Sequence, residues 1–387
     1  MPDMREPLAP RGNEVGVLSH LRSASSLSVT DLAALTRLSR PTVEEAASYL
    51  VERGLVQRIE PEPEVGRKAG RPAKRFAFRA EAGHILACDM GVELIRMLVA
   101  TLDGTIIDRA EVTITGATST AQRFRTAFDA VDELLEAAAL ARSDIWAVGV
   151  ATTGIVDASG IVVRSSRLPE LTGVNLAQEW AKHFPAATVS VGNDARCAAL
   201  AEHWKGAAVD VDTSVTVLAG TALAAAITID GAPYRGWHGA SGEVGGIAEL
   251  GWPRAVTALQ TLRSGKDPER MPFRGADVDF ADPRASDVLA TFIDALAPGL
   301  VALVSIIDPP RVIVGGELAT AGEALVGPIR GILAERCLFP VEVVPSTLGD
   351  DSSLLGALRQ ALNDVDAVLG RPSAISPDAV LLTRNPW

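Results

Sequence analysis

The chain has 387 residues, of which 48% are hydrophobic and 22% are charged, and its formal net charge is −12. This length allows two or three domains and a large core. The three cysteines lie far apart, which argues against a disulfide framework and is typical of a reducing cytoplasm. The N-terminus does not resemble a secretory signal, and no apolar run reaches the ~18 residues that span a bilayer. We therefore expect a cytoplasmic protein with no membrane partner.

The charge is distributed unevenly along the chain. Residues 1–80 hold 13 Lys and Arg against 10 Asp and Glu, a balance of +3, whereas the remainder carries −15. This asymmetry indicates that only the N-terminal part contacts nucleic acid, while the acidic body stays soluble.

The first 80 residues have the pattern of a winged helix-turn-helix. Residues 1–13 form a predicted disordered tail, and residues 14–24 form a predicted helix. Thr30 can cap a short second helix, and Ser39 can cap a third with Pro41 in its first turn and Gly54 at its end. Residues 55–60 and 75–79 are predicted strands around a basic loop. We assign residues 14–80 to a DNA-binding domain.

The third helix is the predicted recognition helix. A recognition helix places its first turns in the major groove, while phosphate contacts fix its register. Arg40 can pair with a guanine or a phosphate, and Ser39 and Thr42 are suited to phosphate contacts. Glu44 and Glu45 are harder to explain, because carboxylates repel phosphate unless one accepts from a cytosine amino group.

The loop of residues 66–79 holds six basic residues and no acidic one. Such a segment can lie in a narrow minor groove, where the negative potential is strongest. The alternative is a solvated charged loop. Next to a helix-turn-helix we favour DNA contact, and the predicted contacts are Arg67, Lys68, Arg71, Lys74 and Arg75.

From residue 84 onward, predicted strands alternate with helices, which indicates an α/β body in two lobes. We assign residues 81–205, together with a C-terminal helix at 352–370, to lobe 1. Residues 206–351 form lobe 2, and 371–387 form a tail. The strands are predicted at 84–91, 145–151, 187–192, 214–219 and 311–316, with a hairpin over 92–114 that turns at Asp103-Gly104. The helices are predicted at 119–141, 194–205, 285–306, 319–336 and 352–368.

Several segments, taken in order, resemble the ROK family of repressors and sugar kinases over residues 14–370. The matching segments are LSRPTV, GRPAKR, CDMG, VGVATTGIVD, RLPELTGVNL, GNDARCAALAE, LAGTALAAAITIDG, RGWHGASGEVGG, IDPPRVIVGG and LGDDSSLLGA. The resemblance implies an actin-like, sugar-kinase-like body behind the winged helix. It also implies a homodimer or homotetramer that binds a double-stranded DNA operator and responds to a sugar.

The phosphate-binding segments depart from the pattern of the family's kinases. The family loop Asp-x-Gly-Gly-Thr is here Asp89-Met90-Gly91-Val92-Glu93, which adds a carboxylate near the triphosphate. The family loop Gly-Thr-Gly-x-Gly is here 220–224, Gly-Thr-Ala-Leu-Ala, whose added methyl groups obstruct close backbone approach. We therefore predict that the chain is not an enzyme and holds no nucleotide cofactor.

The sugar-binding segments are kept in part. The family's Asn-Asp pair corresponds to Asn193-Asp194, and its Gly-Glu-x-Gly-His corresponds to 242–246, where Glu243 remains and the histidine is Gly246. Gln260 stands where the family has a further glutamate. The alternative reading of Asn193-Asp194 is a helix cap, which would explain one residue but not both.

Two further features concern metal and anions. The family's zinc-binding cysteines fall on GWPRAVTA at 251–258, so we predict no structural metal. Arg164, Arg167 and Arg196 lie in or beside the sugar-binding segments. Arginine is suited to planar anions, so an acidic sugar is one hypothesis, with Arg167 as the predicted contact. The alternative is that these arginines form surface or lobe-bridging salt pairs.

Three functions therefore remain open. The leading hypothesis is a ligand-modulated repressor of carbohydrate-related genes, with Asn193, Asp194, Glu243, Gln260 and Arg167 as its effector contacts. The second is an active sugar kinase with an accessory DNA-binding head. The third is a regulator that binds no small molecule and responds to a protein partner.

Overall fold

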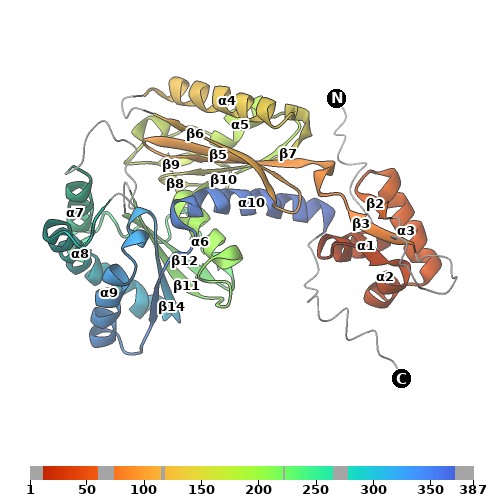
Figure 1. Cartoon of the computed structure of the whole chain (residues 1–387). Coiled ribbons are helices and arrows are strands. Elements are labelled where there is room, and N and C mark those ends of the chain that lie inside the picture. The colour runs from red at the N-terminus through yellow and green to blue at the C-terminus, as the bar shows by residue number, and fades with distance from the viewer. Residues whose placement is uncertain (1–11, 60–73, 115–117, 221–222, 265–277, 371–387) are drawn as a thin grey trace.

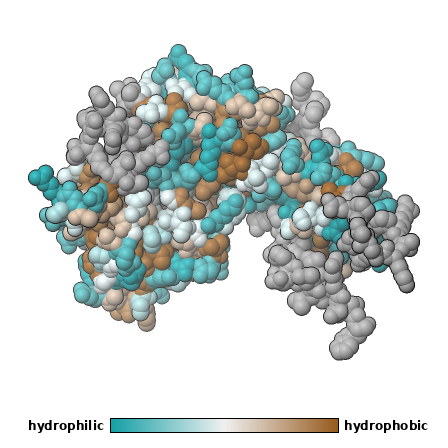
Figure 2. All heavy atoms as spheres, viewed as in Figure 1, coloured by the Kyte–Doolittle hydropathy of each residue, from teal (hydrophilic) through white to brown (hydrophobic). Residues whose placement is uncertain are grey.

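The computed structural model describes residues 12–59, 74–114, 118–220, 223–264 and 278–370. The chain forms an arch of three parts: an N-terminal head, and two lobes that each contain a five-stranded sheet (Figure 1). The head projects from the end of lobe 1, and open space separates it from the described atoms of lobe 2 (Figure 2). The predicted α/β class with a winged helix-turn-helix is confirmed.

The head contains three helices and a three-stranded sheet of order β1-β3-β2. Its buried side chains include Leu18, Leu32, Val43 and Leu50, one apolar stripe from each helix. The helices are α1 (Asn13–Arg22), α2 (Val29–Thr36) and α3 (Arg40–Glu52), and the strands are β1 (Leu27–Ser28), β2 (Val56–Ile59) and β3 (Arg75–Phe78).

The cap of α2 differs from the prediction. Ser28, not Thr30, precedes the helix, and its hydroxyl accepts a hydrogen bond from the backbone N–H of Asp31 at 3.1 Å. The Asp31 carboxylate in turn accepts from the backbone N–H of Ser28, which completes a capping box. This reciprocal pair starts the helix one residue before Thr30. The predicted cap of α3 is confirmed, because the Ser39 hydroxyl accepts from the Thr42 backbone N–H at 3.3 Å.

Lobe 1 is built on a mixed sheet of order β10-β7-β4-β5-β6, in which β4, β7 and β10 run parallel. The helices α4 (Thr120–Ala137) and α5 (Leu176–His183) cover one face (Figure 1). The predicted hairpin is present, and Gly104 takes a positive φ of 84° in its turn. The strands are β4 (His84–Met90), β5 (Leu94–Thr101), β6 (Ile106–Thr113), β7 (Ile145–Thr152) and β10 (Thr188–Asn193), with a separate pair β8 (Ile155–Val156) and β9 (Val162–Arg164).

Lobe 2 repeats this topology, with a sheet of order β13-β12-β11-β14-β15. One face is covered by α7 (Trp252–Ser264), α8 (Pro283–Ile307) and α9 (Glu323–Arg336) (Figure 1). The predicted start of the helix at 319–336 is wrong. A 3-10 turn ends at Ala321, and α9 starts after Gly322, whose φ is 53°. The strands are β11 (Ser214–Ala219), β12 (Leu223–Ile229), β13 (Ala232–Pro233), β14 (Arg311–Gly315) and β15 (Glu342–Pro345).

The remaining elements are two central helices and several 3-10 turns. The central helices α6 (Asp194–Lys205) and α10 (Ser352–Leu369) lie between the two sheets (Figure 1). The 3-10 turns are η1 (Ala80–Ala82), η2 (Arg142–Asp144), η3 (Pro169–Leu171), η4 (Ala248–Leu250), η6 (Glu317–Ala321) and η7 (Gly349–Asp351).

The helix α8 is long and apolar enough to cross a membrane by length and composition alone, with a mean hydropathy of 2.0 over its most apolar window. Half of that window is buried in lobe 2, where Leu289, Phe292 and Leu296 join the core. Every 18-residue window of the helix contains Asp294, so it holds no unbroken apolar run of that length, and burial explains its apolar composition.

Candidate DNA interface and interlobe cavity

The first turn of α3 presents the side chains predicted to read DNA. Ser39 and Arg40 are exposed, and Thr42 is half-buried. The hydroxyls of Ser39 and Thr42 lie 2.8 Å apart, so the cap holds both side chains at the start of the helix. A capped N-terminus with exposed donors can bind a phosphate and leave Arg40 free to approach a base edge.

The structure gives Glu44 a partner that sequence reasoning missed. Lys74, at the end of the wing, places its Nζ 2.8 Å from Oε2 of Glu44, and both side chains are about half exposed. The pair neutralises one of the two unexplained carboxylates and ties the residue before β3 to the recognition helix. Glu45 is exposed. A contact across 30 residues leaves no periodic pattern in the sequence that could have predicted it.

Arg75 lies at the base of the wing, not at its tip. Its Nε donates to the Ser26 hydroxyl at 3.0 Å, and a terminal nitrogen donates to the Ser26 carbonyl at 2.8 Å. These bonds hold β3 against β1, so the predicted DNA contact has a structural role in this state. The other predicted wing contacts, Arg67, Lys68 and Arg71, lie outside the described residues.

Sequence reasoning also missed Arg37, in the turn between α2 and α3. This residue is exposed and has a left-handed backbone, with φ of 59°. A bulky residue rarely adopts this conformation without a reason. The turn places a cation directly beside the exposed end of α3.

A cavity of about 260 Å³ lies between the lobes, and we call it the interlobe cavity. Lobe 1 contributes the ends of β4, β7 and β10, and lobe 2 contributes the start of β12 and the segment around Glu243. The turn before α10 and the first residues of this helix close one side. Of the predicted effector contacts, Asn193, Asp194, Glu243 and Arg167 line this cavity.

Asn193 and Asp194 are held by a small hydrogen-bond network at the start of α6. Asn193 caps the helix, because its Oδ1 accepts from the Arg196 backbone N–H at 3.0 Å. Its Nδ2 donates to the Gly154 carbonyl at 3.0 Å and to Oδ1 of Asp194 at 2.8 Å. Capping therefore explains Asn193. The Asp194 carboxyl is oriented by this amide and is not needed to cap the helix itself.

Burial raises the pKa of Asp194 to about 7, and the negative charges of Asp89 and Glu243 act in the same direction. Among the described residues, no lysine or arginine forms an ion pair with Asp194. Glu243 lines the cavity from lobe 2 at a more exposed position, and partial burial raises its pKa as well. A carboxyl with a pKa near neutrality can donate or accept a hydrogen bond with a sugar hydroxyl.

The glycine before Glu243 is required by close packing. Gly242 has a φ of 86°, and a Cβ at this position would overlap the carbonyl oxygen of Ala225 on β12. Gly246 is different, because a Cβ built there would have no atom within 4 Å. Close packing therefore does not require a glycine at this position.

The part of the cavity around Asp89 is rich in acidic groups. Asp89 forms an ion pair with Arg96 at 2.7 Å, and Arg96 also donates to the carbonyl of Asp350. The described residues that line the cavity include eight acidic side chains and two arginines, Arg96 and Arg167. Glu93 and Glu317 face the cavity from opposite lobes. This charge balance disfavours a triphosphate. Residues 221–222 of the second phosphate loop lie outside the described residues.

Gln260 and two arginines of the sugar-binding segments have different surroundings. Gln260 lies at an exposed position of α7 and is not among the residues that line the cavity, so its role as an effector contact stays a prediction. Arg196 is buried, and its guanidinium donates to the carbonyls of Gly239 and Val156, which bridges the lobes. Arg167 lines the cavity, and its buried Nε has no hydrogen-bond partner.

The segment at 251–258 is held by apolar packing. Trp252 is fully buried, and its Nε1 donates to the carbonyl of Leu296 on α8 at 3.2 Å. A Cβ at Gly299 would overlap the indole ring, so α8 has a matching recess. No cluster of three or more His, Cys, Asp and Glu side chains suited to a metal occurs within the described part of the chain.

A winged helix with an exposed recognition helix, joined to two lobes of identical sheet topology around a polar cavity, defines a DNA-binding transcriptional regulator with a sugar-kinase-like body. Residues 85–249 and 258–363 match the ROK family, and the chain belongs to this family. Residues 10–68 match the MarR family, in agreement with the fold of the head.

The similar proteins include both regulators and kinases. The chain is 23% identical to a xylose repressor of Caldicellulosiruptor bescii over 91% of this chain and 96% of that protein. It is 33% identical to a kanosamine kinase of Amycolatopsis mediterranei over 56% of this chain and 76% of that protein. Among solved structures, a ROK family transcriptional regulator, a homologue of the E. coli MLC protein, is 20% identical and aligns with a TM-score of 0.67 over 92% of this chain and 100% of that chain.

Proposed function

We propose that this protein represses carbohydrate-related genes and that its ROK body binds a sugar without phosphorylating it. The observation that carries the proposal is the division of the interlobe cavity. Its sugar-binding part keeps Asn193, Asp194 and Glu243, whereas its phosphate-binding part is lined by Glu93 and Glu317. A site altered in this way can report a sugar to the DNA-binding head.

Phosphoryl transfer needs a cradle of backbone amides, positive charge on the phosphates and a carboxylate to accept the hydroxyl proton. Asp194 could supply the carboxylate, but Glu93 repels the phosphates. Leu223 and Ala224 begin β12 at the cavity wall, where the family's kinases have a glycine-rich loop. Sugar phosphorylation is the second candidate function, because the similar proteins include kinases.

An ATP-dependent phosphorylation assay over a panel of neutral pentoses and hexoses separates the two candidates. We expect no turnover above background in the wild type. Gly246→His restores the missing imidazole, and a Cβ at this position meets no atom within 4 Å. We expect this variant to remain inactive, because the phosphate-binding part is unchanged. Turnover that Asp194→Ala abolishes would establish a kinase instead.

The proposed effector is a neutral sugar. A phosphosugar or sugar acid would have to be held by Arg167 against the surrounding carboxylates. Calorimetric titration with D-xylose, D-glucose and D-glucose 6-phosphate tests this. We expect a neutral sugar to bind and Asp194→Asn to weaken its binding about tenfold or more. Tighter binding of the phosphate, lost in Arg167→Ala, would favour the acidic effector. No binding across a larger panel would favour a protein partner.

The proposed DNA contacts are Ser39, Arg40, Thr42 and Lys74, with the wing residues Arg67, Lys68 and Arg71. We propose that a homodimer or homotetramer presents two heads to two half-sites of an operator. As a regulator of chromosomal genes, the protein would act in the cytoplasm. Selection of duplexes from a random pool would reveal the half-site. We expect Arg40→Ala to relax its specificity at one position, while Lys74→Ala weakens binding to all sequences.

A further inference from the structure

The head and the body are joined by a buried ion pair. Arg22, at the end of α1, donates to Oδ1 of Asp366 on α10 at 2.6 Å, and the two side chains are 3% and 6% exposed. The other terminal nitrogen of Arg22 donates to the carbonyl of Gly370. The guanidinium also lies 5.6 Å from the ring centre of Phe78 on β3. A single arginine of the head therefore contacts both the side chain and the backbone at the end of α10.

Asp366 is held from the body side as well. Its second carboxylate oxygen accepts from Arg359, about two turns earlier on α10, and Arg359 also donates to Oδ1 of Asn363. The carboxylate thus lies between one guanidinium of the head and one of the body. Removing one partner of such a pair leaves an uncompensated buried charge, so the geometry fixes the head on this helix.

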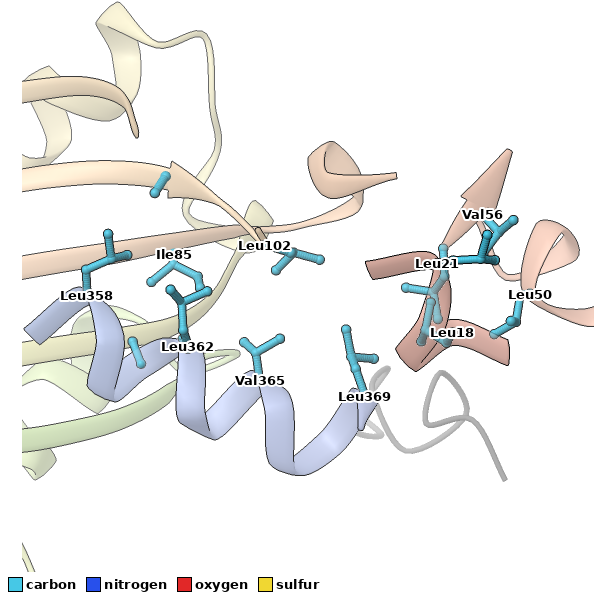
Figure 3. Packing of buried hydrophobic residues seen from close by; sticks show 14 of the residues in the cluster. Leu18, Leu21, Leu50, Val56, Ile85, Leu102, Leu358, Leu362, Val365 and Leu369 are labelled. Atoms are coloured by element: carbon cyan, nitrogen blue, oxygen red, sulfur yellow. The ribbon is translucent and has the colours of Figure 1, made fainter. Parts of the chain in front are cut away.

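Apolar packing surrounds the ion pair. Leu18 and Leu21 of α1 lie next to the end of α10, where Val365 and Leu369 belong to the same buried cluster (Figure 3). A Cβ at Gly370 would press on Val15 of α1. The core of the head and the core beneath the lobe 1 sheet are therefore one continuous cluster that α10 joins.

The other end of α10 reaches the interlobe cavity. Asp351 and Ser353 line this cavity, and the Ser353 hydroxyl donates to the backbone carbonyl of Asp194 at 3.2 Å. Ser353 and Asp366 are 13 positions apart on one helix, which corresponds to about 20 Å at the usual rise. One helix therefore has the cavity at its first turn and the head at its last.

The middle of α10 is packed too tightly to absorb a displacement. A Cβ at Gly356 would overlap the backbone of Cys197 on α6, and a Cβ at Gly149 on β7 would overlap the carbonyl of Ala357 on α10. Backbones in such close contact move together rather than slide past one another. A shift at the first turn of α10 is therefore transmitted along the helix.

We propose that α10 is the element that transmits the state of the interlobe cavity to the DNA-binding head, and that the Arg22–Asp366 pair is its point of attachment to the head. This inference rests on the proposed sugar response. A sugar that contacts Asp194 would change the position of Ser353, and the helix would carry the change to Arg22. The orientation of the head, and with it the spacing of two heads on an operator, would follow.

A double-mutant cycle tests the connection without any sugar. The full-length protein carries Ser353→Ala at the cavity end, Asp366→Asn at the head end, or both, and the Kd for a duplex selected by the wild type is measured. Sites this far apart normally act independently. We expect the effects on Kd to be non-additive by about threefold or more. Additive effects would overturn the proposal.

Two controls keep the cycle interpretable. Arg330→Gln on α9, which breaks an exposed pair with Glu323, replaces Asp366→Asn in a matched cycle that should be additive. Where Asp366→Asn fails to fold, the apolar double variant Arg22→Met/Asp366→Leu takes its place, because it removes both charges of the head–body pair, while the partly exposed Arg359 keeps its hydrogen bonds to Asn363. A folded variant that lacks the Arg22–Asp366 pair should respond to Ser353→Ala differently from the wild type. The same change in the Kd for DNA in both proteins would also contradict the proposal.

A final arm separates this inference from the proposed function. Binding of D-xylose and D-glucose is measured by calorimetry, and their effect on the Kd for DNA is measured in the same variants. If a sugar binds both the wild type and Asp366→Asn but shifts the Kd only in the wild type, both proposals stand. If the sugar shifts the Kd for DNA equally in the wild type and in Asp366→Asn, only the role of the ion pair is overturned. If no sugar binds either protein, the result counts against the proposed function alone.

Discussion

The head–body junction and the interlobe cavity lie at opposite ends of α10, and each contains a buried carboxyl group. At the junction, Asp366 lies between Arg22 and Arg359 and its charge is balanced. In the cavity, the polar partners of the Asp194 carboxyl among the described residues are an amide and a backbone N–H, and its pKa is raised to about 7. The paired carboxylate joins two domains, whereas the unpaired one is available to a ligand.

This contrast follows from the cost of burying charge. A buried carboxylate either pairs with a cation or shifts its pKa toward the neutral form. The junction takes the first route, because Asp366 pairs with the guanidinium groups of Arg22 and Arg359. The cavity takes the second, so its contribution should depend on pH. Substitutions at the two sites should therefore differ in size and in pH dependence.

The largest effect is expected at the junction. Asp366→Ala leaves Arg22 buried without its charge partner, and we expect the free energy of unfolding to fall by about 3–5 kcal/mol. Urea denaturation monitored by circular dichroism measures the change. The control is Glu323→Ala, which breaks the exposed Arg330 pair and should cost less than about 1 kcal/mol. Equal losses in the two variants would remove the distinction between buried and exposed pairs.

An intermediate, pH-dependent effect is expected in the cavity. The pKa of Asp194 is raised from an ordinary 3.8 to about 7 in the folded protein, so the folded state binds more protons than the unfolded state between these values. The wild type should therefore lose stability as the pH rises through this window. Asp194→Asn lacks this loss, and we expect it to be more stable than the wild type by up to about 4 kcal/mol at pH 8 but equally stable near pH 4.

Denaturation series at several pH values would measure this difference. Asn keeps the shape and the acceptor oxygen of the side chain, so a packing defect should not mask the result. A difference between the two proteins that does not vary with pH would mean that Asp194 is not held near neutrality.

The smallest effect is expected at the Glu44–Lys74 pair in the head. Both side chains are about half exposed, so Glu44→Gln should change the free energy of unfolding by about 0.5 kcal/mol or less. The same variant removes a negative charge beside the DNA surface and releases Lys74. We therefore expect the affinity for DNA to rise. We also expect the slope of log K against the logarithm of the salt concentration to steepen by the amount of about one phosphate contact. A large loss of stability would show that the pair is structural.

The sequence predicted most regular elements, because their patterns are local. The cap at Ser39, the turn at Asp103-Gly104 and the helix at 194–205 were all found from neighbouring residues. The short helix α5 and the edge strand β15 were missed, since few residues define them. The start of α2 was misplaced because Ser28 and Thr30 are both good caps, and only the reciprocal bond with Asp31 decides between them.

The candidate site was predicted less completely. Asn193-Asp194 and Glu243 lie together because two separate chain segments meet at the cavity, an arrangement that only the family resemblance indicated. Gln260 does not line the cavity, because position in a motif does not fix the direction of a side chain. The Arg22–Asp366 pair was not predicted, because its partners are 344 residues apart and neither belongs to a recognisable motif.

The most direct test of a sugar-responsive regulator is the affinity for its selected duplex, measured by fluorescence anisotropy with and without a neutral sugar. We predict that a sugar that binds the protein changes the Kd for DNA by about tenfold or more, that Asp194→Asn abolishes the change, and that ATP has no influence. A Kd that stays constant while the protein phosphorylates the sugar at the expense of ATP would contradict the account.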